Sequence, residues 1–462
     1  MQLFSVVENK FVFLSTELLP GFWLAITLLC LLIFLLSLGR RLEPALKLER
    51  VGIPIALLLG TLALFLGPYG PVSLFPQKVT DIWVKLPTPL LTLVFATLML
   101  GRPLPRGKGL WKPVASQAAL GFFLGFGQYL VGGLAVIFLL IPWLGVDPLM
   151  GCLIEVGFEG GHGAAAVMGK SFIKLGFSGG PDLGFAMATV GLLSSTIIGS
   201  ALVVIGRSLG WIGVQTIQGT GITGAREEQI DFFGQIKELA INLFFVGLAV
   251  GIGVFALYIL RLMSPYFGGI YSEVIEVFPV FPLALLASLI IRFLLELLNK
   301  TDLVSQLLQR EIGTLSTDLL IVTAMASLNL PLIKNDWVPI LILSIVGLSW
   351  NLFGSLVYSK YIFTQESFER ALAEFGNATG VAASGILLLR LADPRNTTNT
   401  LQVFSIKQLF LQPLLSGGVI TLFAPIAINR FGLVSWTEVS GLFAFFFIAL
   451  SFFFSRMSPR EI

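Results

Sequence analysis

The sequence is poor in charge, histidine and cysteine. Only 12% of its 462 residues are Asp, Glu, Lys or Arg, and the net charge of +3 is too small to indicate nucleic-acid binding. The two cysteines, Cys30 and Cys152, cannot build a disulfide framework or a zinc cluster. The single histidine, His162, has no serine nucleophile motif to pair with, which argues against an intramembrane protease. We therefore expect no enzyme activity and no cofactor.

Apolar side chains fill the sequence instead. They make up 56% of the chain, including 40 Phe, and the mean hydropathy is +0.91. A bilayer core about 30 Å thick needs roughly 20 apolar residues per helix. Segments of about that length recur between short polar breaks, which predicts an all-α integral membrane protein with eleven spans. The spans lie near residues 22–38, 52–68, 88–101, 113–141, 183–205, 240–262, 277–297, 312–330, 336–359, 405–427 and 436–455.

Basic residues indicate which loops face the cytoplasm. The loops at 39–50 and 102–112 each carry four Lys or Arg, and such loops stay inside. Alternation of the spans then predicts an outer N-terminus and a cytoplasmic C-terminus in the plasma, or bacterial inner, membrane. Arg40 and Arg41 follow the first apolar run instead of preceding it, so we expect this run to remain in the mature protein.

Two segments, 142–182 and 360–404, do not fit a simple spanning helix. Each is moderately apolar, and each is rich in Gly, Ala, Ser or Thr at its centre. Irregular backbone at membrane depth is tolerated only where it is buried in protein or lines a watery cavity. Small residues let such a segment pack closely, and glycine lets it turn. We therefore predict two re-entrant hairpins.

The two segments resemble each other. Aligning EVGFEGGHGAAA at 155–166 with EFGNATGVAASG at 374–385 places Glu155 on Glu374. Upstream, an offset of 226 residues places Trp111 on Trp337. The predicted spans have the same order around both segments, so the chain is expected to contain an internal repeat.

The predicted repeats have opposite orientations in the membrane. The first, 22–205, has five spans with hairpin 142–182 after the fourth, and the second, 240–427, has the same order with hairpin 360–404. Because five is odd, the second repeat enters the membrane from the other side. Inverted repeats are typical of secondary transporters, whose substrate site lies near the midplane where the repeats meet. We expect 206–239 to be a cytoplasmic linker and 436–455 to be an additional helix outside the repeat.

The tips of the two hairpins are the predicted substrate site. Unpaired N–H groups and a half-helix N-terminus attract an anion, and unwound carbonyls offer oxygen ligands to Na⁺. Two alternatives stay open: the glycines serve tight packing alone, and the histidine only ties its turn to a carbonyl. The candidate substrate-binding residues are Gly160, Gly161, His162, Gly163, Asn377, Ala378, Thr379 and Gly380.

Carboxylates inside predicted spans or hairpins are candidate ion ligands. They are costly at membrane depth and usually face a cavity or a partner. Two other interpretations remain: Glu155 and Glu159 lie shallowly near the outer surface, and Asp318 stabilises the N-terminus of a span that begins near 312. The candidate ion-binding residues are Glu155, Glu159, Thr317, Asp318 and Asn351, with Na⁺ as the ion.

The run GGHG at 160–163, with GNATG at 376–380 in the second hairpin, resembles the bacterial sodium:glutamate symporters. The resemblance covers about 22–427, including the order of spans and hairpins. It implies Na⁺-driven transport, paired re-entrant loops in inverted five-helix halves and a dimeric, elevator-type arrangement. Symporters of this family tend to have Thr where this chain has Ala164, and a Thr-Pro-Thr run at its positions 379–381.

The predicted function is Na⁺-coupled uptake of L-glutamate or a closely related anionic amino acid by a homodimer in the lipid bilayer. Na⁺-coupled transport of another carboxylate is an alternative. Another is Na⁺/H⁺ exchange, with Glu155, Glu159 or Asp318 carrying the proton. From a different class, an ion channel would conduct ions without accumulating a substrate.

Overall fold

The computed structural model describes residues 18–46, 55–101, 111–212, 232–329, 334–363, 365–393 and 398–456. Every regular element within these ranges is helical, which confirms the all-α prediction. Seven helices in the described ranges are long and apolar enough to cross a membrane. The chain is therefore a multi-pass membrane protein.

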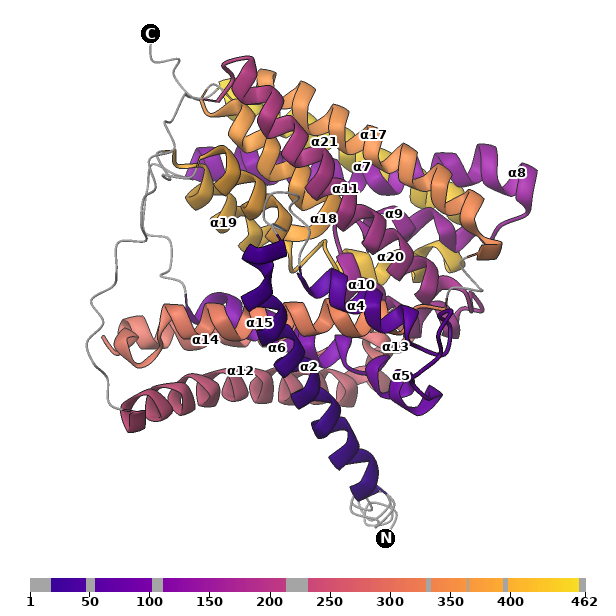
Figure 1. Ribbon diagram of the computed structural model, residues 1–462. Helices are drawn as coiled ribbons and strands as arrows, with labels where there is room; N and C mark the ends of the chain where they lie inside the picture. Colours follow the sequence, from indigo (N-terminus) through magenta and orange to yellow (C-terminus); the bar gives the residue numbers. More distant parts are fainter. Residues whose placement is uncertain are drawn as a thin grey trace.

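One group of helices, which we call the flanking bundle, lies in the lower half of Figure 1. Its apolar contacts join Leu319 to Trp83 and Ala284 to Leu100. Its members are α2 (Leu18–Leu46), α4 (Ile55–Phe65), α5 (Gln77–Trp83), α6 (Pro87–Leu100), α12 (Phe232–Phe267), α13 (Gly269–Val277), α14 (Phe281–Leu297), η4 (Thr301–Leu303) and α15 (Gln306–Ala326).

The remaining helices form the central bundle, which lies above the flanking bundle in Figure 1. Here α7 packs along α21, where Phe126 stacks on Phe443 with ring centroids 4.9 Å apart. The members are α7 (Trp111–Ala135), η2 (Val136–Leu140), α8 (Ile141–Leu144), η3 (Pro148–Cys152), α9 (Leu153–Gly157), α10 (Gly161–Lys174), α11 (Gly180–Ser208), α17 (Trp337–Ile362), α18 (Ser367–Ala392), α19 (Thr400–Leu411), α20 (Val419–Phe431) and α21 (Leu433–Arg456).

The predicted spans all fall on helices, with two differences of detail. The span at 405–427 consists of α19 and α20, which a turn at 412–418 separates; Ser416 and Gly417 have φ of 59° and 92° in this turn. The span predicted to begin near 312 begins at Gln306, because polar side chains at its start do not prevent a helix. Of the predicted linker 206–239, residues 213–231 lie outside the described residues.

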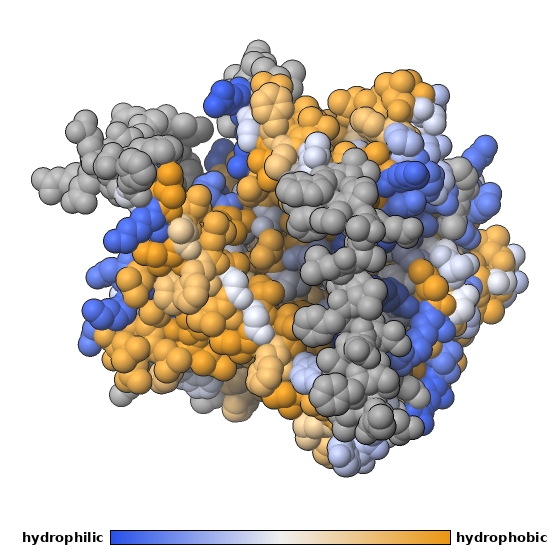
Figure 2. Space-filling model, turned by 90° about the horizontal axis from the view of Figure 1, so that it is seen from below, coloured by the Kyte–Doolittle hydropathy of each residue, from blue (hydrophilic) through white to orange (hydrophobic). Residues whose placement is uncertain are grey.

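An apolar surface covers much of the flanking bundle. Figure 2 views the molecule from the side of α12 and α14 and shows apolar side chains across most of that face. Phe255 is 63% exposed there and Leu297 is 67% exposed. A face of this kind is stable against lipid tails, which agrees with a membrane protein.

The first non-spanning segment is a pair of short helices. α9 ends at Gly157 and α10 begins at Gly161, whose φ is +64°. Both helices reach the same turn of α11, because a Cβ on Gly184 would lie 3.2 Å from the Ala165 Cβ and 3.9 Å from Val156. The chain therefore doubles back between α9 and α10.

The second non-spanning segment is α18, which Gly380 and Val381 interrupt. Val381 has a φ of 68°, a strained conformation for a β-branched residue. A Cβ on Gly376 would lie 2.7 Å from the Cα of Gly385. Residues nine apart in a straight helix are separated by roughly 13 Å, so the two limbs of α18 lie side by side.

This contact between the limbs can be tested with Gly376→Val. The added side chain would meet the backbone of Gly385, and overpacking of this kind costs about 1–3 kcal/mol. We expect a clearly lower unfolding temperature in detergent than for Gly251→Val, because a Cβ on Gly251 meets nothing within 4 Å. Equal unfolding temperatures for the two variants would contradict the side-by-side limbs.

Candidate functional site

Three interruptions of helical backbone meet inside the central bundle. They are the turn between α9 and α10, the break in α18 and the turn at 412–418. A Cβ on Gly161 would collide with the side chain of Val381, so the first two interruptions touch. The third joins them, because the Ser416 hydroxyl and the Asn377 amide each lie 3.4 Å from Oε1 of Glu159.

Glu155 is held by three neutral donors. Its carboxylate accepts hydrogen bonds from the Tyr129 hydroxyl at 2.6 Å, the Ser416 backbone N–H at 2.9 Å and the Thr421 hydroxyl at 2.8 Å. The side chain is fully buried. Glu155 therefore fastens the turn at 412–418 to α7 and α9.

Glu159 is as buried as Glu155 but poorly bonded. Its Oε2 has no hydrogen-bond partner in the described part of the chain, and the contacts of Oε1 are long. A Cβ on Gly125 of α7 would lie 2.8 Å from this Oε2. An unpaired buried carboxylate oxygen is costly, so Glu159 suits a bound cation. Both carboxylates are buried among the helices of the central bundle.

The break in α18 is fixed by amide side chains. The carbonyl of Ala378 accepts hydrogen bonds from Gln128 at 2.7 Å and from Asn351 at 2.8 Å. Asn351 also donates to the Thr379 hydroxyl at 3.2 Å. The predicted residues Asn351, Ala378 and Thr379 thus lie together, and Gln128 completes the group.

A fully buried ion pair lies beside the same break. The Lys407 ammonium contacts both carboxylate oxygens of Glu374, at 2.9 and 3.0 Å, and Gln117 donates to this carboxylate at 2.9 Å. Next to Lys407, Gln408 donates to Asn377 at 2.6 Å. The polar groups of α7, α18 and α19 therefore form one network.

His162 and Gly163 face neighbouring helices. The His162 Nε2 lies 3.1 Å from the Thr189 hydroxyl of α11, and its ring stacks near Phe185. The partner of this nitrogen in the described part of the chain is thus a hydroxyl of α11. Gly163 lies against Leu91 of α6, where a Cβ would be 2.6 Å from Cδ1.

Asp318 does not join the other candidates. It pairs with Arg40 of α2 at 2.6 Å, within the flanking bundle. Because α15 begins at Gln306, Asp318 also lies well beyond the first turn and does not stabilise a helix N-terminus. Thr317 lines a cavity between the two bundles, together with Ala382 and Ala383, which follow the break in α18.

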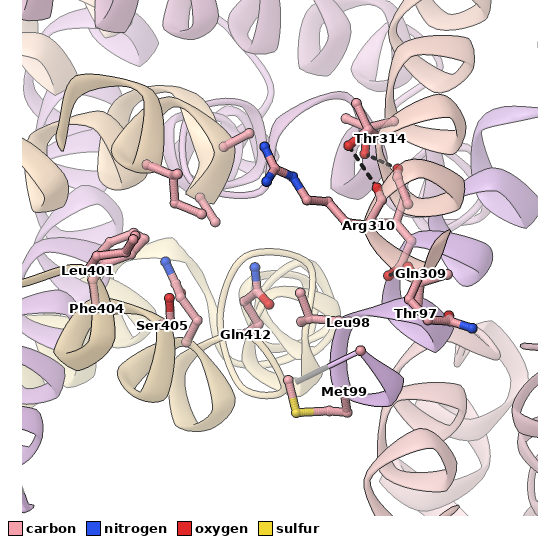
Figure 3. A pocket seen from close by; sticks show the side chains of 18 of the residues that line it. Thr97, Leu98, Met99, Gln309, Arg310, Thr314, Leu401, Phe404, Ser405 and Gln412 are labelled. Atoms are coloured by element: carbon pink, nitrogen blue, oxygen red, sulfur yellow. Dashed lines mark hydrogen bonds between the residues drawn. The ribbon is translucent and has the colours of Figure 1, made fainter. Parts of the chain in front are cut away.

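This cavity has a volume of about 780 Å³. Helices α6 and α15 line it on one side, and the second limb of α18 and helix α19 line it on the other (Figure 3). Its lining includes Gln408 and Gln412, whose Oε1 atoms have no hydrogen-bond partner among the described residues.

Two arginines line the cavity from opposite bundles. Arg310 belongs to α15 and extends into the cavity in Figure 3, and Arg390 belongs to the second limb of α18. Neither pairs with an acidic side chain in the described ranges, and the two repel each other electrostatically. The cavity is therefore positively charged.

Several residues of this site are absent from the sequence-based prediction. Gln117, Gln128 and Lys407 lie inside predicted spans, where polar and charged side chains are rare and usually functional. A polar or charged side chain inside a predicted span is therefore enough to identify all three as candidates. Arg310 precedes its predicted span, so no rule of this kind indicates it.

The bonds of Glu155 lead to a testable prediction for Tyr129→Phe. The change removes a buried hydrogen bond to a carboxylate, and such bonds contribute about 1.5–3 kcal/mol. We expect a lower unfolding temperature in detergent than for Tyr361→Phe, since Tyr361 is 69% exposed. A Tyr129→Phe protein as stable as this control would show that the bond is not needed.

A comparison with protein families agrees with the sequence-based resemblance. The sequence profile of a family described as sodium/glutamate symporter matches residues 23–364. Among solved structures, the sodium proton antiporter MjNhaP1 from Methanocaldococcus jannaschii at pH 8 is similar, with 14% identity and a TM-score of 0.44 over 93% of this chain and 99% of that chain. No curated protein sequence matches the chain. Because the profile spans 342 of the 462 residues (364 − 23 + 1), the chain belongs to the sodium/glutamate symporter family, which is a family of Na⁺-coupled transporters.

Proposed function

We propose that this protein carries L-glutamate, or a closely related anionic amino acid, into the cell together with Na⁺. The observation that carries the proposal is the cavity between the bundles, which presents the unpaired Arg310 and Arg390 to its interior. A positively charged cleft with low-dielectric walls concentrates anions. A dicarboxylate fits the two arginines, because each guanidinium can bind one carboxylate in a bidentate way.

The second limb of α18 adds to this attraction. Its first residues, Ala382 and Ala383, line the cavity. The N-terminus of a helix carries roughly half a positive charge and free N–H groups, which favour an anion. Because alanine side chains are small, they leave the backbone N–H groups accessible next to the predicted substrate residues Thr379 and Gly380.

The route for the cation runs from the cavity to Glu159. Gln408 lines the cavity and bonds to Asn377, and Asn377 lies next to Glu159. Amide and carboxylate oxygens are the hard ligands that Na⁺ prefers. Each Na⁺ that enters down a potential of 100 mV contributes about 2.3 kcal/mol, so coupling to Na⁺ can drive accumulation of the substrate.

Transport requires the cavity to open alternately to the two sides. We propose an elevator-type movement of the central bundle against the flanking bundle, within a homodimer. Two inverted repeats, 22–205 and 240–427, would supply the two hairpins. Helix α10 of the central bundle packs on α6 of the flanking bundle through Gly163 and Leu91, so this movement would change that contact.

The direct test is uptake of radiolabelled L-glutamate by proteoliposomes with Na⁺ outside and K⁺ inside. We expect accumulation that requires Na⁺ and that unlabelled glutamate blocks. A panel of unlabelled dicarboxylates and amino acids identifies the substrate class. Folded protein that accumulates no acidic amino acid under a Na⁺ gradient would refute the proposal.

The arginines allow a sharper prediction. Arg310→Gln and Arg390→Gln each remove a charge that attracts the substrate, so we expect the KM for glutamate to rise at least tenfold, which corresponds to about 1.4 kcal/mol. Lys300→Gln is the matched control, because Lys300 is exposed and does not line the cavity. An unchanged KM in both arginine variants would exclude the cavity as the route of the anion.

Na⁺/H⁺ exchange is the second candidate, because Glu155 and Glu159 are two buried carboxylates four residues apart in sequence. It predicts Na⁺-dependent proton movement without any organic substrate. A pH-sensitive dye inside the same proteoliposomes measures this directly. Alkalinisation or acidification that depends on added glutamate would favour symport instead.

A further inference from the structure

The ion pair between Lys407 and Glu374 has no role in the proposed binding of substrate or Na⁺. Both side chains are fully buried, and the ammonium nitrogen bonds to both carboxylate oxygens. A Cβ on Gly121 of α7 would lie 3.0–3.1 Å from the end of the lysine side chain and 3.3 Å from the carboxylate. The glycine therefore provides the room that the pair occupies.

A buried ion pair costs free energy to form, so its presence requires a physical reason. The desolvation of two charges often exceeds their mutual attraction, so apolar residues of the same size are frequently as stable. Here the pair lies on α18 and α19, close to the break in α18. The presence of this ion pair in the polar network is explained if the Glu374 carboxylate requires a cation beside it.

The predicted internal repeat indicates which ion this ammonium replaces. The sequence alignment places Glu374 on Glu155. Each carboxylate lies shortly before the interruption of its segment, Glu155 on α9 and Glu374 on the first limb of α18. On the first side, Glu155 has only neutral donors and Glu159 has an oxygen without a partner, so in the described part of the chain no ammonium or guanidinium bonds to either carboxylate. On the second side, Lys407 compensates Glu374 directly.

The two sides also influence each other. Lys407 attracts and Glu374 repels negative charge at Glu159. Around the interruptions the described side chains include three buried carboxylates, at 155, 159 and 374, but a single ammonium, at 407. Lys407 thus neutralises Glu374 permanently, and the carboxylates of Glu155 and Glu159 are left for mobile cations.

We propose that the Lys407 ammonium is a resident cation in the position where the second repeat would otherwise bind Na⁺. Glu374 therefore takes no Na⁺ in this protein, and a neutral side chain at position 407 turns it into an additional Na⁺ site. The geometry supplies a second ligand, because Oε1 of Gln117 beside Glu374 has no hydrogen-bond partner. The inference rests on Na⁺ coupling but not on glutamate as the substrate.

The test compares three proteins: wild type, Lys407→Met and the double variant Glu374→Gln/Lys407→Met. Methionine keeps the length of the lysine stem and removes only the charged end, and the double variant removes both charges. Thermal unfolding of each purified protein is measured across a series of NaCl concentrations, with KCl keeping the ionic strength constant. No organic substrate is present.

We expect Lys407→Met to be the least stable protein in KCl and to gain the most from NaCl. A ligand that binds only the folded state raises its stability with concentration, and one more Na⁺ site should raise the slope against log[Na⁺] by about one ion. The double variant should depend on Na⁺ as the wild type does. In proteoliposomes, the ratio of ²²Na⁺ to transported substrate should rise in Lys407→Met.

A folded Lys407→Met protein with the Na⁺ dependence of the wild type would overturn the proposal. If Lys407→Met does not fold at any NaCl concentration, Lys407→Gln provides the same comparison. If both fail to fold in NaCl while the double variant folds, Na⁺ does not replace the ammonium and the proposal is equally wrong. An extra Na⁺ site without glutamate uptake would support this inference and refute the proposed substrate.

Discussion

The structure depends on the constraint that a backbone interruption inside a membrane must find its hydrogen-bond partners within the protein. Helical backbone ends at three places in the central bundle, and polar side chains from neighbouring helices lie at each of them. Gln128 and Asn351 bond to the carbonyl of Ala378, and Glu155 bonds to the N–H of Ser416. The interruptions are therefore stable only together, because each supplies partners to the others.

The same constraint places the functional groups at the junction of the two bundles. The hairpin limbs end where α6 and α15 of the flanking bundle pass by, and the cavity lies in this junction. Arg310 and Arg390 face it from different bundles, so a relative movement of the bundles changes the distance between two like charges. Under the proposed function, a bound dianion would offset their repulsion and would thereby influence the position of the central bundle.

Much of this arrangement could be predicted from local features of the sequence. Long apolar runs identified a multi-pass membrane protein, although only seven helices of the described ranges are long and apolar enough to cross a membrane. Glycine-rich breaks with ionisable residues identified the segments around Gly161 and Gly380. The resemblance carried by GGHG and GNATG agrees with the family match over residues 23–364. The candidate ion ligands do not all lie in the same place. Glu159 lies at the meeting of the interruptions, whereas Asp318 pairs with Arg40, a partner 278 residues away that no local pattern reveals.

The sequence by itself determined the class of the protein, because the length and hydropathy of a segment decide whether it enters a bilayer without reference to other segments. It also indicated two of the three interruptions of the backbone, around Gly161 and Gly380, but not the turn at 412–418, which lies inside a predicted span. Only the tertiary structure decided which charges meet. Lys407 lies 33 residues from Glu374, and Arg310 lies 80 from Arg390 (390 − 310). Contacts of this kind depend on how helices pack, and packing is a property of the whole fold.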